Sequence, residues 1–235
     1  MAPASSASRL VAEAARTRLR PLGLRQRGRS RLWLDDHGWW LGLVEFPSPR
    51  WSQGSGLQVG AMWLWQDVDH FAFHVSERLS GTEDYRSEEQ FSPVAEELAL
   101  RAHFSVQTLR AQFPDLRSVA SHLAAQPVRR GWFWEPWNAG VAAALVGDVS
   151  LAQQRFGAVL DEEPLAPWME DAQQTARELV AMGRDRDAVR AWALSSIASC
   201  RQRLRLAPAP LEWPGGNGAE WLRDTAEPPT PVKQP

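Results

Sequence analysis

The sequence predicts an α+β protein: an N-terminal helix, an antiparallel β-meander of about four strands, and a helical C-terminal half. Three observations predict this class. Apolar residues recur at helical spacing near the N-terminus, they alternate along short segments between residues 29 and 79, and helical spacing returns after residue 92. The 235 residues can bury enough apolar surface for stability without metals or disulfides.

The first helix is expected over Ser8–Arg20, whose apolar face carries Val11, Ala15 and Leu19. It should end at Pro21 and Gly23, because proline lacks an amide proton and glycine accepts a left-handed exit. Residues 1–31 hold eight arginines and one acid, so an arm that binds anionic polymers or targets a mitochondrion is the alternative. The helical spacing favours a plain helix.

The alternating segments predict strands at Arg29–Asp35, Trp39–Phe46, Leu57–Trp65 and His70–Leu79. Asp36-His37-Gly38 suits a tight hairpin turn between the first two, because Asp and Gly tolerate unusual backbone angles. The segment Pro47–Gly56 is too rich in Pro, Ser and Gly for regular structure. We therefore expect a long loop between the second and third strands.

Six tryptophans lie between Ser30 and Trp65. On the third strand one face would carry Leu57, Val59, Ala61, Trp63 and Trp65. On the second strand both faces are apolar, with Trp39, Leu41 and Leu43 on one side and Trp40, Val44 and Phe46 on the other. This pattern is typical of a sheet covered on both faces, so most of these rings are predicted to be core rather than a stacking platform for bases or sugars.

The helical half is expected to begin at Ser92-Pro93, with the apolar stripe Val94, Leu98, Ala102, Val106 and Leu109. A shorter helix should carry Leu116, Val119, Ala120 and Leu123. An offset of 36 residues then aligns Gly147 with Gly183, Ala152 with Ala188, and Phe156 with Trp192. This self-similarity predicts two successive helical hairpins.

These segments divide the chain into residues 8–126, a sheet with covering helices, and residues 132–206, a helical-hairpin region. Residues 207–235 are rich in Pro, Gly and Glu and are predicted to be a disordered tail. The tail contains Trp213 and Trp221, which would either anchor a partner or pack back onto the body.

Composition narrows the function classes. The formal net charge of −2 argues against binding of nucleic acid by the whole chain. No apolar run approaches a bilayer span, so no membrane contact is expected. The single cysteine, Cys200, indicates a reducing compartment and is expected to be buried, which predicts a cytoplasmic protein. Lys233 is the only lysine, and this preference for arginine indicates a high-GC bacterium.

The usual motifs of enzymes are missing from the sequence: it has no GxSxG elbow, phosphate loop, dinucleotide fingerprint or HExxH helix. His70 and His74 would lie more than about ten ångströms apart on a strand, too far for one metal ion. No metal and no cofactor are predicted. Oligomeric state is left open.

The candidate site combines the loop residues Arg50, Trp51, Ser52 and Gln53 with Asp35, His37 and Trp40 as the rim of a pocket. An arginine beside an exposed tryptophan can bind a carboxylate or phosphate and offer a stacking surface. Asp35 and His37 could supply general acid–base chemistry, although the formation of a turn also accounts for them.

The segment Arg9–Leu79 resembles uncharacterised bacterial proteins of the domain of unknown function 4304 family, through Leu22-Gly23, Trp33 and Leu57-Gln58-Val59-Gly60. Glu135–Leu206 is similar to tetratricopeptide repeats, with matching residues at Gly140, Ala152, Phe156 and Pro164. The first resemblance implies an α+β fold and a cytoplasmic bacterial setting, without a catalytic residue.

Two functions follow as hypotheses. The first is a non-enzymatic interaction protein, in which the sheet and hairpins hold another protein as the partner. The second is an enzyme or small-ligand binder that uses a pocket near the Pro47–Gly56 loop.

Overall fold

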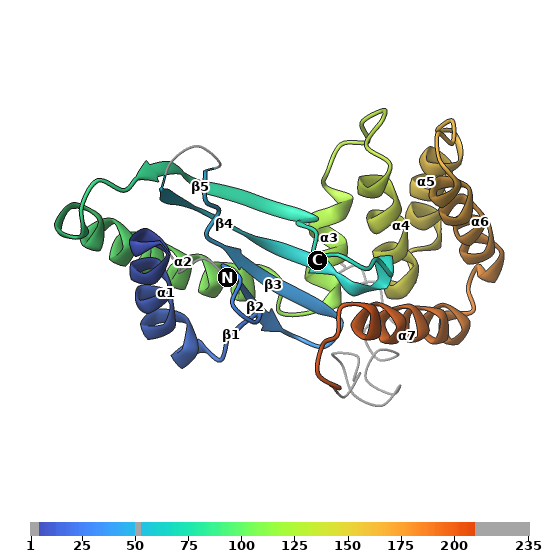
Figure 1. The fold of residues 1–235 in the computed structure, drawn as a ribbon. Coiled ribbons are helices and arrows are strands. Elements are labelled where there is room, and N and C mark those ends of the chain that lie inside the picture. The colour runs from blue at the N-terminus through green and yellow to red at the C-terminus, as the bar shows by residue number, and fades with distance from the viewer. Residues whose placement is uncertain (1–4, 50–52, 210–235) are drawn as a thin grey trace, which may run out of the picture.

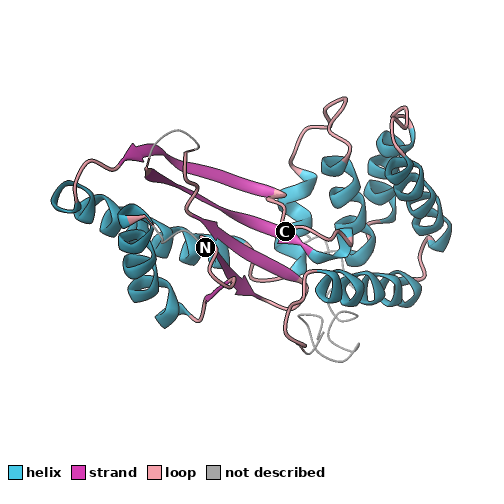
Figure 2. Ribbon diagram, viewed as in Figure 1, coloured by secondary structure: helices cyan, strands magenta, loops and turns pink. Residues whose placement is uncertain are grey.

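The computed structural model describes residues 5–49 and 53–209. Figure 1 shows a twisted sheet that runs through the molecule, with two helices under one end and a group of helices at the other. Figure 2 shows the same division, with the strands lying between the two helical groups. The α+β class and the order of helix, meander and helical half are confirmed.

The described helices begin with α1 (Ser6–Leu19) and, after the sheet, continue with α2 (Glu88–Gln112), α3 (Leu116–Ala124), α4 (Trp134–Val146), α5 (Val149–Leu160), α6 (Pro167–Met182) and α7 (Arg186–Arg203). The strands are β1 (Arg25–Gln26), β2 (Leu32–Asp36), β3 (Trp40–Glu45), β4 (Gly54–Trp63) and β5 (Val75–Asp84). Short 3₁₀ turns occupy Arg20–Leu22 and Leu64–Gln66. None of the described helices is both long and apolar enough to cross a membrane.

The sheet is an antiparallel meander in the order β1-β2-β3-β4-β5. Its register places Trp33 opposite Val44, and Trp40 opposite Trp63. The sheet has one strand more than the four expected segments, because β1 has only two residues and leaves no alternation to detect.

Both faces of the sheet are buried. Trp33, Val44 and Val59 belong to a cluster with α1 and α2. Leu41, Leu43 and Met62 belong to a second cluster that continues into α3–α7, so the two-sided burial predicted for β3 is confirmed. This second cluster contains residues from both predicted regions, 8–126 and 132–206.

The tryptophans form much of the second cluster. Trp63 and Trp65 are fully buried, and their ring centroids lie 5.6 Å apart in a stacked arrangement. Trp39 stacks on both rings, at 6.2 Å from Trp63 and 5.7 Å from Trp65. Trp65 Nε1 also donates a hydrogen bond of 3.0 Å to Asn138 Oδ1 of α4. These rings are core, as the alternation predicted.

Several predicted boundaries are wrong. The third strand runs from Gly54 to Trp63 rather than from Leu57 to Trp65, so it begins inside the segment predicted as a loop, because Gly54 and Ser55 pair with β5. The last strand begins at Val75 rather than His70, because Phe71 and Phe73 pack against the core from a loop. The long helix begins at Glu88, before Ser92-Pro93, because the Ser87 hydroxyl caps it by accepting from Gln90 N at 3.2 Å. The added turn buries Phe91.

The first helical hairpin depends on a glycine. A Cβ added at Gly140 of α4 would lie 2.7 Å from the buried ring of Phe156 in α5. The lack of a side chain therefore lets the two helices approach, with the ring filling the space between them.

Gly140→Ala is expected to lower the free energy of unfolding by about 1–3 kcal/mol, because the added methyl group would force the fully buried ring of Phe156 to shift. Gly157→Ala on helix α5 is the matched control, since a Cβ added there would meet nothing within 4 Å. The control should gain about 0.5–1 kcal/mol from reduced backbone entropy. Urea unfolding of both variants measures the difference, and equal effects would contradict the close packing.

Candidate functional site

Asp35 lies at the end of β2 and is 5% exposed. Arg110 of α2 binds it through two hydrogen bonds, from Nε at 2.8 Å and from Nη2 at 2.7 Å. The same Nη2 donates to the carbonyl of Leu22 at 2.7 Å. Arg110 was missed by the sequence reasoning, since nothing in the sequence links two residues 75 positions apart.

His37 completes this cluster. Its Nε2 lies 2.9 Å from Asp35 Oδ2, and its ring stacks on Trp40 with centroids 4.1 Å apart. Trp40 is buried and meets Phe113 edge to face. The structure thus brings together three of the predicted site residues, and packing fixes all three.

The carboxyl group of Asp35 is held in its ionised form. Burial would raise the pKa of its carboxyl, but the hydrogen bonds from Arg110 and His37 outweigh this effect and lower the pKa below its usual value. A general base needs a carboxylate with a pKa raised toward neutrality. The cluster therefore fits a structural ion pair better than acid–base catalysis.

This lowered pKa predicts a pH dependence of stability. The carboxylate of Asp35 should stabilise the fold above its unfolded-state pKa of about 3.9, and the contribution is lost as the pH falls through the lower folded-state value. Unfolding free energies of the natural protein and Asp35→Asn should therefore differ at neutral pH and converge in acid. A constant difference would contradict the lowered pKa.

The neighbouring Asp36 faces the other side of the sheet. Arg201 of α7 binds its two carboxylate oxygens at 2.8 Å each and donates to the carbonyl of Gly38 at 2.8 Å. The side chain of Arg201 is only 6% exposed. Two successive carboxylates of one hairpin thus fasten helices on opposite faces of the sheet.

The loop residues of the predicted site lie elsewhere. Arg50, Trp51 and Ser52 fall outside the described residues. Gln53 is exposed and precedes β4, and its backbone carbonyl accepts a hydrogen bond of 2.7 Å from Tyr85 N. The turn at His37 precedes β3 and the loop that ends at Gln53 follows it, so they lie at opposite ends of that strand. The structure does not bring Gln53 to the Asp35 cluster.

The histidines suggest no metal site. His74 Nδ1 accepts a hydrogen bond of 3.0 Å from Trp63 N, and burial lowers its pKa to about 3. His70 is exposed beside Asp69. Over residues 5–49 and 53–209 no three His, Cys, Asp or Glu side chains are placed to share an ion.

Cys200 is buried, as predicted. Its Sγ lies 3.4 Å from the carbonyl of Val68, and burial raises the pKa of the thiol to about 11. A thiol that stays protonated at neutral pH is a poor nucleophile. Cys200 is therefore a packing residue.

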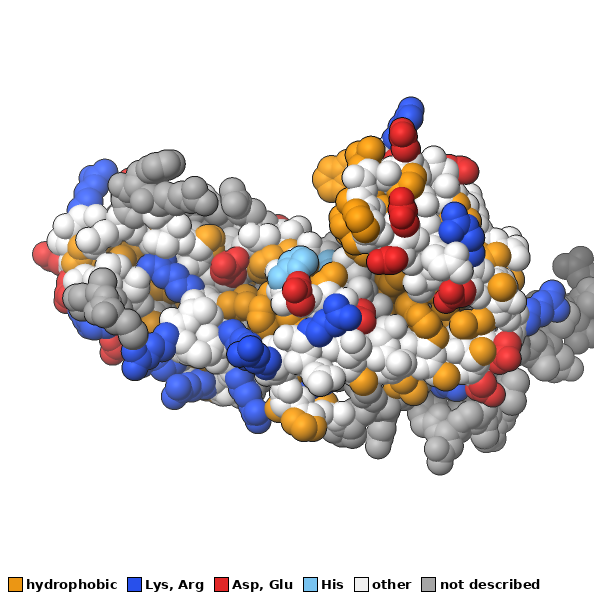
Figure 3. Space-filling model, turned by 45° about the vertical axis from the view of Figure 1, so that its right-hand side comes forward, with side chains coloured by type: hydrophobic (Ala, Val, Ile, Leu, Met, Phe, Trp, Pro, Cys, Tyr) orange, Lys and Arg blue, Asp and Glu red, His pale blue; other side chains and the backbone are white. Residues whose placement is uncertain are grey.

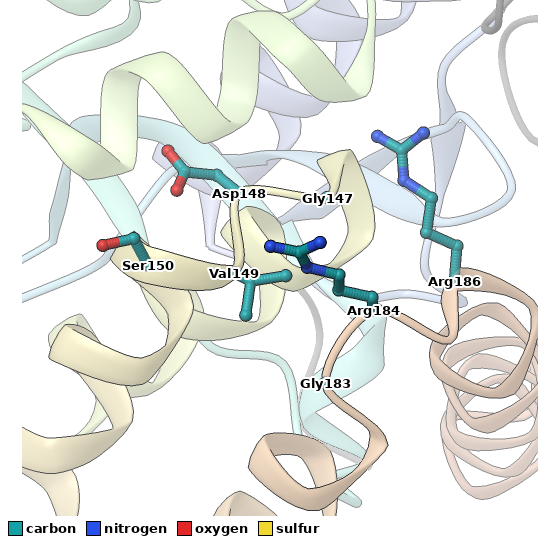
Figure 4. A pocket seen from close by; sticks show the side chains of 7 residues that line it. All are labelled: Gly147, Asp148, Val149, Ser150, Gly183, Arg184 and Arg186. Carbon is teal, nitrogen blue, oxygen red and sulfur yellow. The ribbon is translucent and has the colours of Figure 1, made fainter.

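A pocket of about 430 Å³ lies between the α4–α5 turn and the α6–α7 turn. Figure 4 shows its lining residues, with the Arg184 side chain extending from the α6–α7 turn toward the α4–α5 turn. The helix ends there already have acidic partners, because Asp148 caps α5 and Asp185 caps α7. Arg186 donates to the carbonyl of Val146. The helix ends at this pocket are therefore already capped, and Arg184 is an exposed cation of its lining.

A group of exposed apolar side chains stands out on the α3–α4 and α5–α6 loops and at the start of α6. We call it the aromatic patch, and it consists of Val128 (49% exposed), Trp132 (53%), Leu165 (83%) and Trp168 (46%). Figure 3 shows a part of the molecule that projects upward at the right of the view. Hydrophobic side chains gather on it, with acidic side chains next to them. Such large exposed rings contrast with the buried tryptophans of the sheet.

The aromatic patch is held in place from below. Trp168 stacks on the half-buried Trp134 with centroids 5.1 Å apart and meets Phe133 edge to face at 5.4 Å. Glu162 accepts a hydrogen bond of 2.7 Å from Gly131 N, which joins the two loops that carry the patch. The guanidinium of Arg129 lies 3.7 Å from the ring centroid of Trp132. The patch is therefore a preorganised surface.

Comparison with protein-family models, with curated proteins and with solved structures finds no match to this chain. The resemblances to the domain of unknown function 4304 family and to tetratricopeptide repeats therefore stay predictions. Functional assignment rests on the geometry of the molecule itself.

Proposed function

We propose that the protein is a non-enzymatic interaction protein and that the aromatic patch binds another protein. The observation that carries this proposal is the exposure of Trp132 and Trp168 on two segments that contact each other through Gly131 and Glu162 and through Phe133 and Trp168. Folded proteins rarely expose contiguous apolar patches without using them. Tryptophan is also among the residues that contribute most to binding energy at protein interfaces.

The contacts under the patch support the proposal. Because Trp168 is already stacked and Trp132 is already covered by Arg129, little side-chain freedom remains to be lost on binding. A surface of this kind can bind tightly over a small area. The proposed partner is a protein, because exposed tryptophan and aliphatic side chains are typical of protein interfaces.

The second hypothesis, an enzyme or small-ligand binder near the Pro47–Gly56 loop, gains no support from the described residues. Its candidate acid, Asp35, is engaged by Arg110 and His37. The aromatic patch is the better-supported site.

Quantitative affinity capture from the native cells tests the proposed function. The bait is the full chain, and its variants are Trp132→Ala/Trp168→Ala and Phe104→Ala. Phe104 is 58% exposed on α2, so it controls for the loss of an exposed aromatic ring elsewhere. We expect a partner that is retained by the natural chain and Phe104→Ala, lost with the double variant, and bound in a fixed ratio when purified. Identical recovery with all three baits would contradict the proposal.

A further inference from the structure

We infer that the segment held by the aromatic patch is basic as well as apolar, an inference that rests on the proposed function. The reason is the charge around the patch. Phe156–Ala176, which contains Leu165 and Trp168, has five acidic residues and no arginine or lysine. An apolar surface inside an acidic rim selects a partner of opposite charge.

Most of this negative charge is free to meet a partner. Four of these acids are exposed, and among the described residues their carboxylates make no hydrogen bond or ion pair. They are Asp161, Glu163, Glu170 and Asp171. Glu162 is engaged by Gly131 N, and Glu135 by Arg129. The fold thus uses two acids near the patch and leaves four outside its own contacts.

Positive charge near the patch does not balance these acids. Arg129 binds Glu135 and lies over the ring of Trp132, so its charge is already shared. Arg130 is the other basic residue in the loop between α3 and α4, and it is exposed. A cation from the partner would therefore meet four unshared carboxylates and two exposed tryptophan rings, and both kinds of group attract cations.

The same charges argue against two other occupants. A second copy of the chain would bring an identical acidic rim against this one. Residues 210–235 contain four acidic and two basic residues, so their charge also has the wrong sign. A basic apolar segment of a different protein matches the surface best.

Fluorescence anisotropy with a labelled synthetic peptide tests this inference. The probe is a short peptide of leucine and lysine at helical spacing, and its counterpart replaces every lysine with glutamate. We expect the full chain to bind the lysine peptide at least about tenfold more tightly than the glutamate peptide. Raising the salt from about 50 to 300 mM should weaken binding several-fold, because exposed charges are screened.

Matched charge reversals locate the effect. Glu163→Lys/Glu170→Lys should weaken binding of the lysine peptide about tenfold. Glu89→Lys/Glu97→Lys changes the net charge equally at two exposed positions of α2 and should have little effect. Trp132→Ala/Trp168→Ala should abolish binding. Circular dichroism confirms that each variant is folded.

Several results would overturn the inference. No binding of the lysine peptide at about 1 mM, equal binding of both peptides, or equal effects of both charge reversals would each contradict it. Tighter peptide binding after deletion of residues 210–235 would show that the chain's own tail occupies the patch. A dimer that Trp132→Ala/Trp168→Ala dissociates would show that a second copy does. If capture of a partner still depends on the aromatic patch but the lysine peptide does not bind, the proposed function stands and only the basic character of the partner segment is wrong.

Discussion

Replacing Arg110 by alanine is expected to lower the free energy of unfolding by about 3 kcal/mol. The physical reason is the burial of Asp35, which is 5% exposed and receives two of its hydrogen bonds from Arg110. Without the guanidinium, His37 is the one side-chain partner that this carboxylate keeps among residues 5–49 and 53–209. Leu22 would also lose the donor to its carbonyl.

Chemical denaturation measures this effect, with Arg101→Ala as the control. Arg101 is an exposed arginine on the same helix, so its loss should change stability by no more than about 0.5 kcal/mol. Asp35→Asn combined with Arg110→Ala should cost less than the sum of the two single changes. A loss below about 1 kcal/mol for Arg110→Ala would show that Asp35 is not effectively buried.

Trp63→Ala is the second change with a large expected effect, a loss of about 3–5 kcal/mol. Trp63 is fully buried, stacks with Trp39 and Trp65, and meets Phe113 edge to face at 5.2 Å. Its Nε1 has no hydrogen-bond partner among the described residues. The cost therefore comes from the cavity and the lost ring contacts, rather than from a broken hydrogen bond.

The control for Trp63→Ala is Trp132→Ala in the aromatic patch. Because Trp132 is 53% exposed, its removal leaves no cavity and should cost less than about 1 kcal/mol. The midpoint of urea unfolding separates the two cases. Similar midpoints for both variants would mean that the tryptophans of the sheet are not its core.

The fold could be predicted where the pattern of apolar residues was long and regular. The alternation around β3 and β4 and the helical spacing of α1 and α3 placed these elements within a few residues. Phe71 and Phe73 misled the prediction, because a loop that packs on the core can show the same alternation as a strand. Boundaries of this kind are decided by tertiary contacts.

The Asp35 cluster could be predicted only in part. Asp35, His37 and Trp40 are close in sequence, so their meeting follows from one hairpin. The partners Arg110 and Arg201 come from distant helices, and only the folded chain selects them from its many arginines.

The aromatic patch could not be predicted from the sequence. Trp132 and Trp168 look like the buried tryptophans in composition and surroundings, and only tertiary packing leaves them exposed. The acidic run at Asp161–Glu163 was visible in the sequence, but its nearness to Trp132 depends on the contact between Gly131 and Glu162.

The central claim is that another protein covers the aromatic patch, and photo-crosslinking in the native cells tests it most directly. A benzophenone amino acid at Leu165, which is 83% exposed, places the reactive group in the aromatic patch, on the loop that leads into α6 and Trp168. We predict a discrete heavier adduct with a second protein from this position. The adduct should be missing when the group is placed at Phe104 or when Trp132 and Trp168 are replaced by alanine. No adduct from Leu165, or the same adducts from Leu165 and Phe104, would contradict the claim.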